Sequence, residues 1–164
     1  MKIETFKINT LYRGIALEGI CRIIPYSTYS VTMEKPYKGL SKSAYLRNGF
    51  TMENIIGRIK WELGRLYEQY QNILYDYDNY KRLWAEWKQY DSQLQALIEE
   101  AIALKEEADA ETLAFLDLHI GMLKRDVIER FYELMEKYGI KPLSLSPSVL
   151  AISIELIENE FCNR

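Results

Sequence analysis

The sequence lacks long hydrophobic runs, and cysteine and proline are scarce. Its longest apolar stretches are a few residues, far short of the ~20 that a membrane-spanning helix needs, and no secretory signal is visible. The two cysteines, Cys21 and Cys162, lie far apart and have no paired spacing. These features argue against a disulfide framework or a zinc site and predict a cytoplasmic protein that acts away from membranes.

Motifs of known enzyme chemistry are also missing. The single histidine, His119, has no second histidine or cysteine at ligand spacing. There is no Walker loop, no nucleophile elbow and no dinucleotide-binding glycine motif after a strand. The paired glutamates at 99–100 and 106–107 do not face one another on a helix. We therefore expect no catalysis, no metal and no cofactor, with an enzyme lacking a recognisable motif as a minor alternative.

Charge of one sign does not dominate the whole chain, but it is unevenly distributed. The 164 residues carry a net charge of −3, so duplex nucleic acid is not an expected partner. Residues 1–50 hold eight basic and three acidic side chains (+5), and residues 51–164 hold 13 basic and 21 acidic ones (−8). Either the basic head packs on an acidic helical body, in its own chain or a neighbour, or the head binds an anion.

The head, residues 1–50, reads as short strands. Apolar residues alternate over 15–24, residues 29–33 are β-branched and aromatic, and residues 5–11 are a weaker third candidate. Gly14 and Gly19 can supply a turn and a bulge. The pattern is lost from residue 34 to residue 50, which we expect to be a loop.

Residues 51–164 read as helical. A 4-3 apolar spacing runs from Met52 to Ala108 and predicts one helix over about 51–108, with Thr51 as N-cap. A second helix is predicted over about 110–138, between an Asp109 N-cap and Gly139. Residues 148–161 suit a helix better than a strand, because Ser146 and Pro147 form a helix start. The predicted fold is α+β and predominantly helical: a small β head of about three strands, a long antiparallel helical hairpin and a short C-terminal helix.

The length of the first helix indicates a partner. As one straight helix, residues 51–108 span roughly 85 Å at about 1.5 Å per residue. The second helix covers only its distal part, so the stripe from Met52 to Tyr77 needs the head, the C-terminal segment or a second copy to cover it. We expect a homo-oligomer through this helix. The alternative is a break at 76–79, which gives a compact three-helix bundle and needs no partner.

Aromatic residues gather along the first helix. Tyrosine and tryptophan are favoured in protein interfaces because they combine a large area with a polar tip. They suit a packed helical seam or an exposed face that binds a partner protein. The candidate interface residues are Tyr70, Tyr77, Tyr80, Trp84 and Trp87.

A second aromatic group is interleaved with basic residues in the head. Aromatic rings stack on bases, and lysine and arginine meet phosphates. The candidate residues for an anionic, nucleotide-like ligand are Arg22, Tyr29, Lys35, Tyr37, Lys38 and Lys42.

Two classes of function follow from these patterns. The first is a non-enzymatic, homo-oligomeric interaction protein that binds a partner protein through its aromatic helical face or its head. The second is a small-ligand binder that sequesters an anionic nucleotide at the head. Motif-free chains of this kind are common among accessory proteins of phages and mobile elements, an interpretation that assigns no role to any residue.

Overall fold

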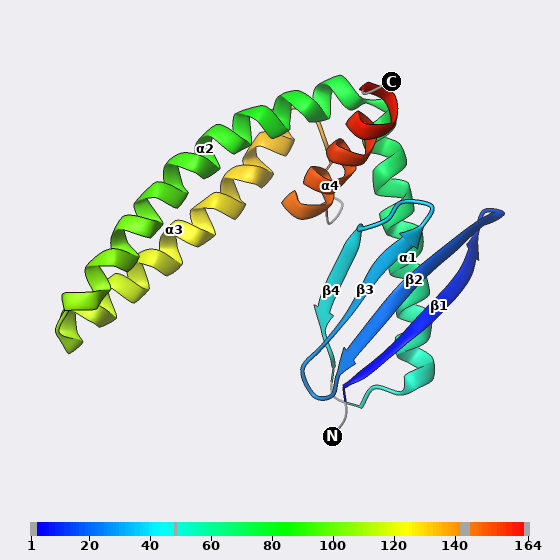
Figure 1. The fold of residues 1–164 in the computed structure, drawn as a ribbon, viewed down its shortest axis with the longest axis horizontal. Helices are drawn as coiled ribbons and strands as arrows, with labels where there is room; N and C mark the ends of the chain where they lie inside the picture. Colours follow the sequence, from blue (N-terminus) through cyan, green and yellow to red (C-terminus); the bar gives the residue numbers. More distant parts are fainter. Residues whose placement is uncertain (1–2, 48, 142–144, 163–164) are drawn as a thin grey trace. The chain divides into compact units, whose positions relative to one another are not determined.

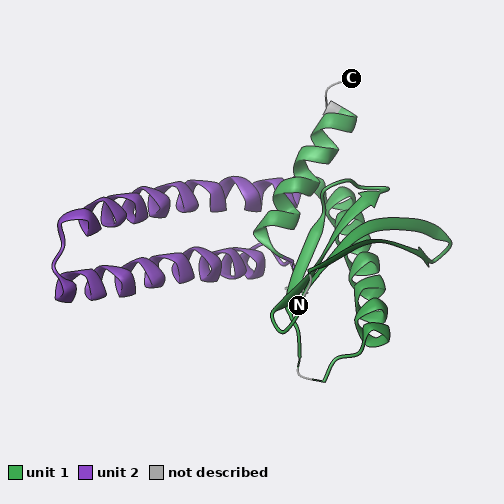
Figure 2. Cartoon of the chain, turned by 60° about the horizontal axis from the view of Figure 1, so that its bottom comes forward, with its two compact units in different colours: residues 1–77, 146–164 green, residues 78–145 purple. Residues whose placement is uncertain are grey.

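The computed structural model describes residues 3–47, 49–141 and 145–162. The chain divides into two compact units (Figure 2). The first, which we call the sheet unit, comprises residues 1–77 and 146–164, and the second, the hairpin unit, comprises residues 78–145. Residue 50, where we placed a boundary, marks the change from strands to helices, whereas the compact units divide after Tyr77.

The sheet unit contains one antiparallel sheet of four strands in the order β1-β2-β3-β4 (Figure 1). The strands are β1 Glu4–Tyr12, β2 Ile15–Ile24, β3 Thr28–Lys35 and β4 Ser41–Tyr45. The first three confirm the expected strands. The fourth lies in the segment that we expected to be a loop, and that expectation is wrong. Its residues are mostly polar, and it is held as an edge strand by pairing with β3 rather than by an apolar face of its own. The α+β, predominantly helical fold class is confirmed.

Gly19 lies at the β-bulge between β2 and β3, as the sequence predicted. A Cβ atom there would lie 2.9 Å from the carbonyl oxygen of Thr32 and 3.1 Å from Cδ2 of Leu63. Glycine at this position therefore allows the sheet and the first helix to approach closely.

Helix α1, Met52–Tyr75, covers one face of the sheet (Figure 1). Thr51 is its N-cap, because the Thr51 hydroxyl accepts a hydrogen bond of 3.2 Å from the backbone N–H of Asn54. The apolar side of α1 is buried against the sheet and α4. From Ile59 to Ile73, the stripe that suggested a second copy is thus covered within its own chain, by the head and the C-terminal segment. Its fully buried members are Ile59, Leu63, Leu66, Tyr70 and Ile73, whereas Met52 at its start is 41% exposed.

The expectation of one continuous helix over 51–108 is wrong, and the alternative of a break near residue 76 is confirmed. α1 ends at Tyr75, Asp76 has φ −118° and ψ 44°, and α2 begins at Tyr77. Aspartate favours helix ends because its short polar side chain competes for backbone hydrogen bonds. The break does not produce a three-helix bundle, since α1 belongs to the sheet unit.

The hairpin unit consists of α2 (Tyr77–Leu104), a 3₁₀ turn (Lys105–Glu107) and α3 (Ala110–Lys137). The Asp109 side chain accepts a hydrogen bond of 2.7 Å from the Thr112 N–H, which confirms the predicted N-cap. Gly139 follows α3 with φ 71°. The two helices bury one seam of apolar residues, formed by Leu83, Trp87, Leu94, Ile98 and Ala101 of α2 and by Leu116, Ile120, Leu123, Val127, Phe131 and Leu134 of α3.

The C-terminal segment is a helix, as favoured over a strand. α4, Pro147–Ile157, is capped by Ser146, whose hydroxyl accepts a hydrogen bond of 3.2 Å from the Val149 N–H. A π-helical turn, Glu158–Cys162, follows it. Among the described residues, no helix combines the length and apolar character that crossing a membrane requires.

Candidate functional site

The residues predicted to bind an anion in the head do not converge on one site. Arg22 is exposed on the outer face of the sheet, opposite Ser30 of β3. Tyr29 lies on the inner face and is 7% exposed, which leaves little of its ring for a ligand. Lys42 pairs with the buried Val31 and is half-buried.

The other three predicted residues lie near the end of β3. Lys35 forms an ion pair of 3.7 Å with Glu18 of β2, and Lys38 is exposed in the turn that follows. The ring of Tyr37 stacks on the ring of Tyr70 of α1 with centroids 3.6 Å apart. Tyr37 thus packs the turn against the helix. The ring face that was expected to stack on a ligand stacks on Tyr70 instead.

This stack belongs to a cluster of four tyrosines between the strands and α1, which also includes Tyr12 and Tyr67. Tyr12 donates a hydrogen bond to Glu68, and Gln71 donates one to the Tyr37 hydroxyl. Burial is the main cause that raises the pKa of Tyr70 from 10.0 to about 12. The cluster therefore has a structural role: it joins the sheet to α1, with hydrogen bonds at the hydroxyls of Tyr12 and Tyr37.

The aromatic residues of the predicted interface are largely packed. Tyr70 is 1% exposed and Trp87 is 7% exposed. The indole N–H of Trp87 donates a hydrogen bond of 2.9 Å to the Val127 carbonyl, and its ring meets Phe131 edge-on at 5.6 Å. Tyr77, Tyr80 and Trp84 are half-buried. The contacts of Trp87 favour the interpretation of a helical seam.

Among the described residues, we next consider the side chains that could act as nucleophiles or metal ligands. His119 stacks beside Phe115, with ring centroids 6.4 Å apart. Burial raises the pKa of the Cys21 thiol from 9.0 to about 11, which disfavours the reactive thiolate. The described part of the chain holds no group of three or more side chains placed to bind a metal ion.

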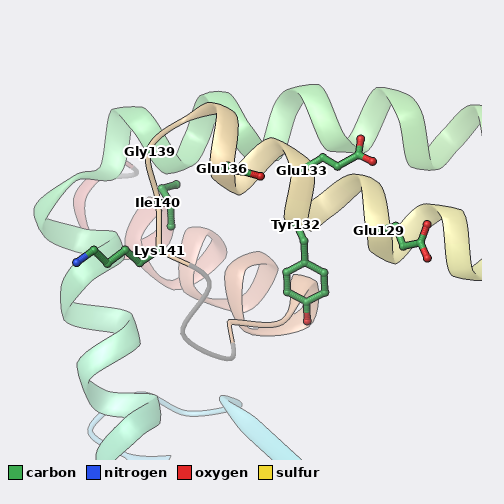
Figure 3. A pocket seen from close by; sticks show the side chains of 7 residues that line it. All are labelled: Glu129, Tyr132, Glu133, Glu136, Gly139, Ile140 and Lys141. Carbon is green, nitrogen blue, oxygen red and sulfur yellow. The ribbon is translucent and has the colours of Figure 1, made fainter.

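A hollow of about 650 Å³ lies at the end of α3 in the hairpin unit (Figure 3). Its wall includes Glu129, Glu133 and Glu136, with Tyr132 and Lys141. The three carboxylates come from successive turns of the helix and are strung along it rather than gathered at one point (Figure 3). Glu133 is paired with Arg130 at 3.2 Å. The hollow is acidic but has no convergent set of ligands.

A cavity of about 420 Å³ lies in the sheet unit, where β4 leads into α1. We call it the β4–α1 pocket. Its wall carries two arginines, Arg47 and Arg58, with Tyr29, Tyr45 and Phe50 as aromatic members. Only Tyr29 was among the predicted ligand residues. The sequence did not predict the pocket, because its wall comes from β3, β4, the linker and α1, which only the fold brings together.

An apolar stripe runs along the side of α3 that points away from α2, and we call it the outer stripe. Leu118 lies about 200° round the helix from the buried Leu116. Leu118 is 64% exposed, and its neighbours Phe115 and Met122 are 67% and 49% exposed. Phe115, Leu118 and Met122 follow a 3-4 spacing in the sequence, as the buried row does, so spacing alone does not show which of the two rows is exposed.

Glu86, near the open end of the hairpin, accepts hydrogen bonds from Lys137 at 2.8 Å and from the Tyr138 hydroxyl at 2.5 Å. These bonds hold the pKa of Glu86 below its ordinary value of 4.5. A lowered pKa contributes stability that is present above pH 4.5 and is lost as the pH falls through the folded-state pKa.

Glu86→Gln is therefore expected to lower the melting temperature at pH 7 more than at pH 3. Thermal unfolding followed by circular dichroism at both pH values measures the difference. Glu99→Gln, at an exposed position of the same helix, serves as the control. An equal effect of Glu86→Gln at both pH values would show that its charge does not stabilise the hairpin.

Comparisons with known proteins give no relative. No protein-family model matches the chain, and no match was found among curated proteins or solved structures. A function must therefore be proposed from the geometry alone.

Proposed function

We propose that the protein is a non-enzymatic binding protein that acts as a homodimer, formed through the outer stripe of α3. The observation that carries the proposal is the exposure of Phe115, Leu118 and Met122 on one side of a helix whose other side is already packed. Large apolar side chains grouped on an exposed face mark interaction sites. The self-association expected from the sequence is thus assigned to α3 in place of the first predicted helix.

The outer stripe is complementary to itself. If two copies of α3 pack antiparallel about a two-fold axis at Leu118, residues equally far from Leu118 on either side face each other. Phe115 then faces Gly121 of the partner subunit, so that a large ring meets a position without a side chain. A Cβ atom at Gly121 would have nothing within 4 Å in the single chain, so this space is open to a partner.

The charges at the ends of the stripe follow the same symmetry. Glu111 and Arg125 lie seven residues before and after Leu118, and both are exposed. In the antiparallel pair, Glu111 faces Arg125 of the partner subunit, and the same contact occurs twice. Opposite charges that meet in register favour this pairing over a parallel one, in which like charges would meet. A second copy of this chain is therefore the occupant that best fits the stripe.

The dimer is tested by sedimentation velocity over protein concentrations from about 1 μM to about 1 mM, the range suited to a modest interface. We expect wild-type protein to shift from monomer to dimer and Leu118→Glu to remain monomeric. Leu104→Glu is the matched control, because Leu104 is 62% exposed, close to the 64% of Leu118, but lies on α2 outside the stripe.

A charge exchange sharpens the test. Glu111→Arg alone should weaken the dimer, and adding Arg125→Glu should restore it, because the exchange recreates both ion pairs. Wild-type protein that stays monomeric at every concentration would overturn the proposal. Equal weakening by Leu104→Glu and Leu118→Glu would place the contact elsewhere on the hairpin.

A further inference from the structure

The sheet has an outer face, on the side away from α1 (Figure 1). The strand register places Cys21 of β2 and Val31 of β3 on the side of α1, where both are buried. The alternate residues of each strand point to the outer face, and those that follow are all exposed or half-buried. They are Thr5 and Lys7 of β1, Ile20, Arg22 and Ile24 of β2, Thr28, Ser30 and Thr32 of β3, and Ser41, Ser43 and Tyr45 of β4.

This part of the outer face carries positive charge without a carboxylate of its own. Lys7 and Arg22 are both exposed and are diagonal neighbours in the β1–β2 register, which places them about 7–8 Å apart. Neither belongs to an ion pair among the described residues. Glu18, the next outward residue of β2, is already paired with Lys35 at 3.7 Å. Both cations therefore remain available to an anionic partner, although the chain as a whole is acidic.

A row of hydroxyl groups continues across the sheet from Arg22. Ser30 of β3 lies opposite Arg22, and Ser43 of β4 lies opposite Ser30. In the neighbouring row, Thr32 lies opposite Ser41. Hydroxyl groups donate hydrogen bonds to phosphate and sugar oxygens and add no negative charge that would repel them. Two cations followed by neutral donors suit the backbone of a nucleic acid.

Two exposed tyrosines lie at one end of this face. Tyr45, near the end of β4, is 85% exposed, and Tyr26, in the turn between β2 and β3, is 77% exposed. The backbone N–H of Leu46 donates a hydrogen bond of 2.9 Å to the carbonyl of Ser27, so this turn lies beside the end of β4. Aromatic rings stack on the bases of single strands. An acidic protein surface needs the cations but not the rings, so the rings favour a nucleic acid.

We propose that the outer face of the sheet binds single-stranded nucleic acid. The sugar–phosphate backbone crosses the strands over Lys7, Arg22 and the hydroxyl row, and a base stacks on Tyr45. A duplex fits less well, because its paired and stacked bases cannot reach the ring. Of the ligand residues predicted from the sequence, this part of the face includes only Arg22. The face belongs to the sheet unit, so the proposal does not depend on a dimer through α3.

The test is fluorescence anisotropy of the intact protein with a labelled oligothymidylate of about twelve nucleotides, a length typical of single-strand sites. Oligouridylate of the same length is titrated in parallel, because DNA and RNA share the recognised chemistry. We expect at least one of the two to bind, and a duplex of the same length to bind at least about tenfold more weakly. The logarithm of the affinity should fall with the logarithm of the salt concentration, with a slope of about −1.4 for two neutralised phosphates.

Variants assign the contacts to the outer face. Lys7→Ala and Arg22→Ala should each weaken binding about tenfold and reduce the slope to about −0.7, because one phosphate contact is lost. Tyr45→Ala should weaken binding about fivefold or more and leave the slope unchanged, since stacking neutralises no phosphate. Lys60→Ala and Tyr75→Ala are the matched controls, because they remove an exposed lysine and an exposed tyrosine from α1, and both should leave the affinity unchanged.

Absence of binding by both oligonucleotides overturns the proposal, and so does a duplex that binds as tightly as the single strands. Poly-L-glutamate is the competitor that separates nucleic acid from an acidic protein. If it displaces the labelled strand as well as unlabelled oligonucleotide does, the face recognises negative charge alone and the proposal fails. Equal losses from Lys7→Ala and Lys60→Ala would also reject the outer face as the site. Circular dichroism of each variant confirms that it is folded.

Discussion

Replacing Trp87 with alanine is expected to unfold the hairpin unit. The indole ring is 7% exposed, packs edge-on against Phe131 and donates a hydrogen bond to the Val127 carbonyl. Truncation of a buried tryptophan typically costs about 3–5 kcal/mol, through lost burial and the cavity that is left. A unit built on a single seam between two helices has few other contacts to compensate for that loss.

Hydrogen exchange measured by mass spectrometry can follow the two units separately. In Trp87→Ala, amides of residues 78–141 should lose protection, while those of β2 and α1 should keep theirs. Trp84→Ala is the comparison, because Trp84 is only half-buried on the same helix and should have a smaller effect. If Trp87→Ala left the hairpin protected, Trp87 would be better explained as part of a binding face, as the sequence also allowed.

Gly64→Ala is expected to destabilise the sheet unit, although alanine is the better helix former. A Cβ atom at Gly64 would lie 2.7 Å from Cδ2 and 2.9 Å from Cε2 of the Tyr12 ring. That ring cannot move away freely, since its hydroxyl donates to Glu68 and its edge meets Tyr67. Overpacking costs about 1–3 kcal/mol, and because two ring atoms would lie under 3.0 Å from the new Cβ, we expect a cost above the gain of about 1 kcal/mol in helix propensity.

Gly57→Ala provides a matched control on the same helix. Gly57 lies seven residues before Gly64, and a Cβ atom there would meet nothing within 4 Å. Only the propensity gain of about 1 kcal/mol then applies, so this variant should be more stable than wild type. Urea unfolding of both variants measures the two changes. Stabilisation by both substitutions would show that the Tyr12 ring yields easily.

Local signals in the sequence predicted the helical parts well. Thr51, Asp109 and Ser146 each cap a helix, because a side-chain oxygen beside free backbone N–H groups acts within one turn. The main prediction of one helix over 51–108 missed the break at Asp76, because the 3-4 apolar spacing continues across a single non-helical residue. Strand β4 was missed because its stability comes from pairing with β3, which the sequence of β4 alone does not encode.

The candidate sites were harder to predict, for a physical reason. Composition located basic and aromatic residues in the head but could not tell which side of the sheet each would face. Tyr29 points inward and Tyr37 stacks on Tyr70, so neither ring is free to stack on a ligand, as the sequence had suggested. The β4–α1 pocket combines residues from strands, a loop and a helix, and such a combination depends on the tertiary fold.

The two compact units differ in the surfaces that they present. The hairpin unit presents the exposed outer stripe on α3, for which we propose a second copy as partner, and the sheet unit presents a pocket with two arginines. Since these features lie in separate compact units, variants of one should leave the other intact. That separation allows self-association and ligand binding to be measured independently in the same protein.

Cross-linking at Leu118 tests the dimer most directly. In an antiparallel pair of helices about 8–10 Å apart, residues on the two-fold axis bring their Cα atoms to about 4–5 Å, close enough for a disulfide. In a Cys162→Ser background, Leu118→Cys should form a covalent dimer on mild oxidation, whereas Leu104→Cys should not. If the two variants cross-link equally, or Leu118→Cys remains monomeric at high protein concentration, the outer stripe is not the self-association surface.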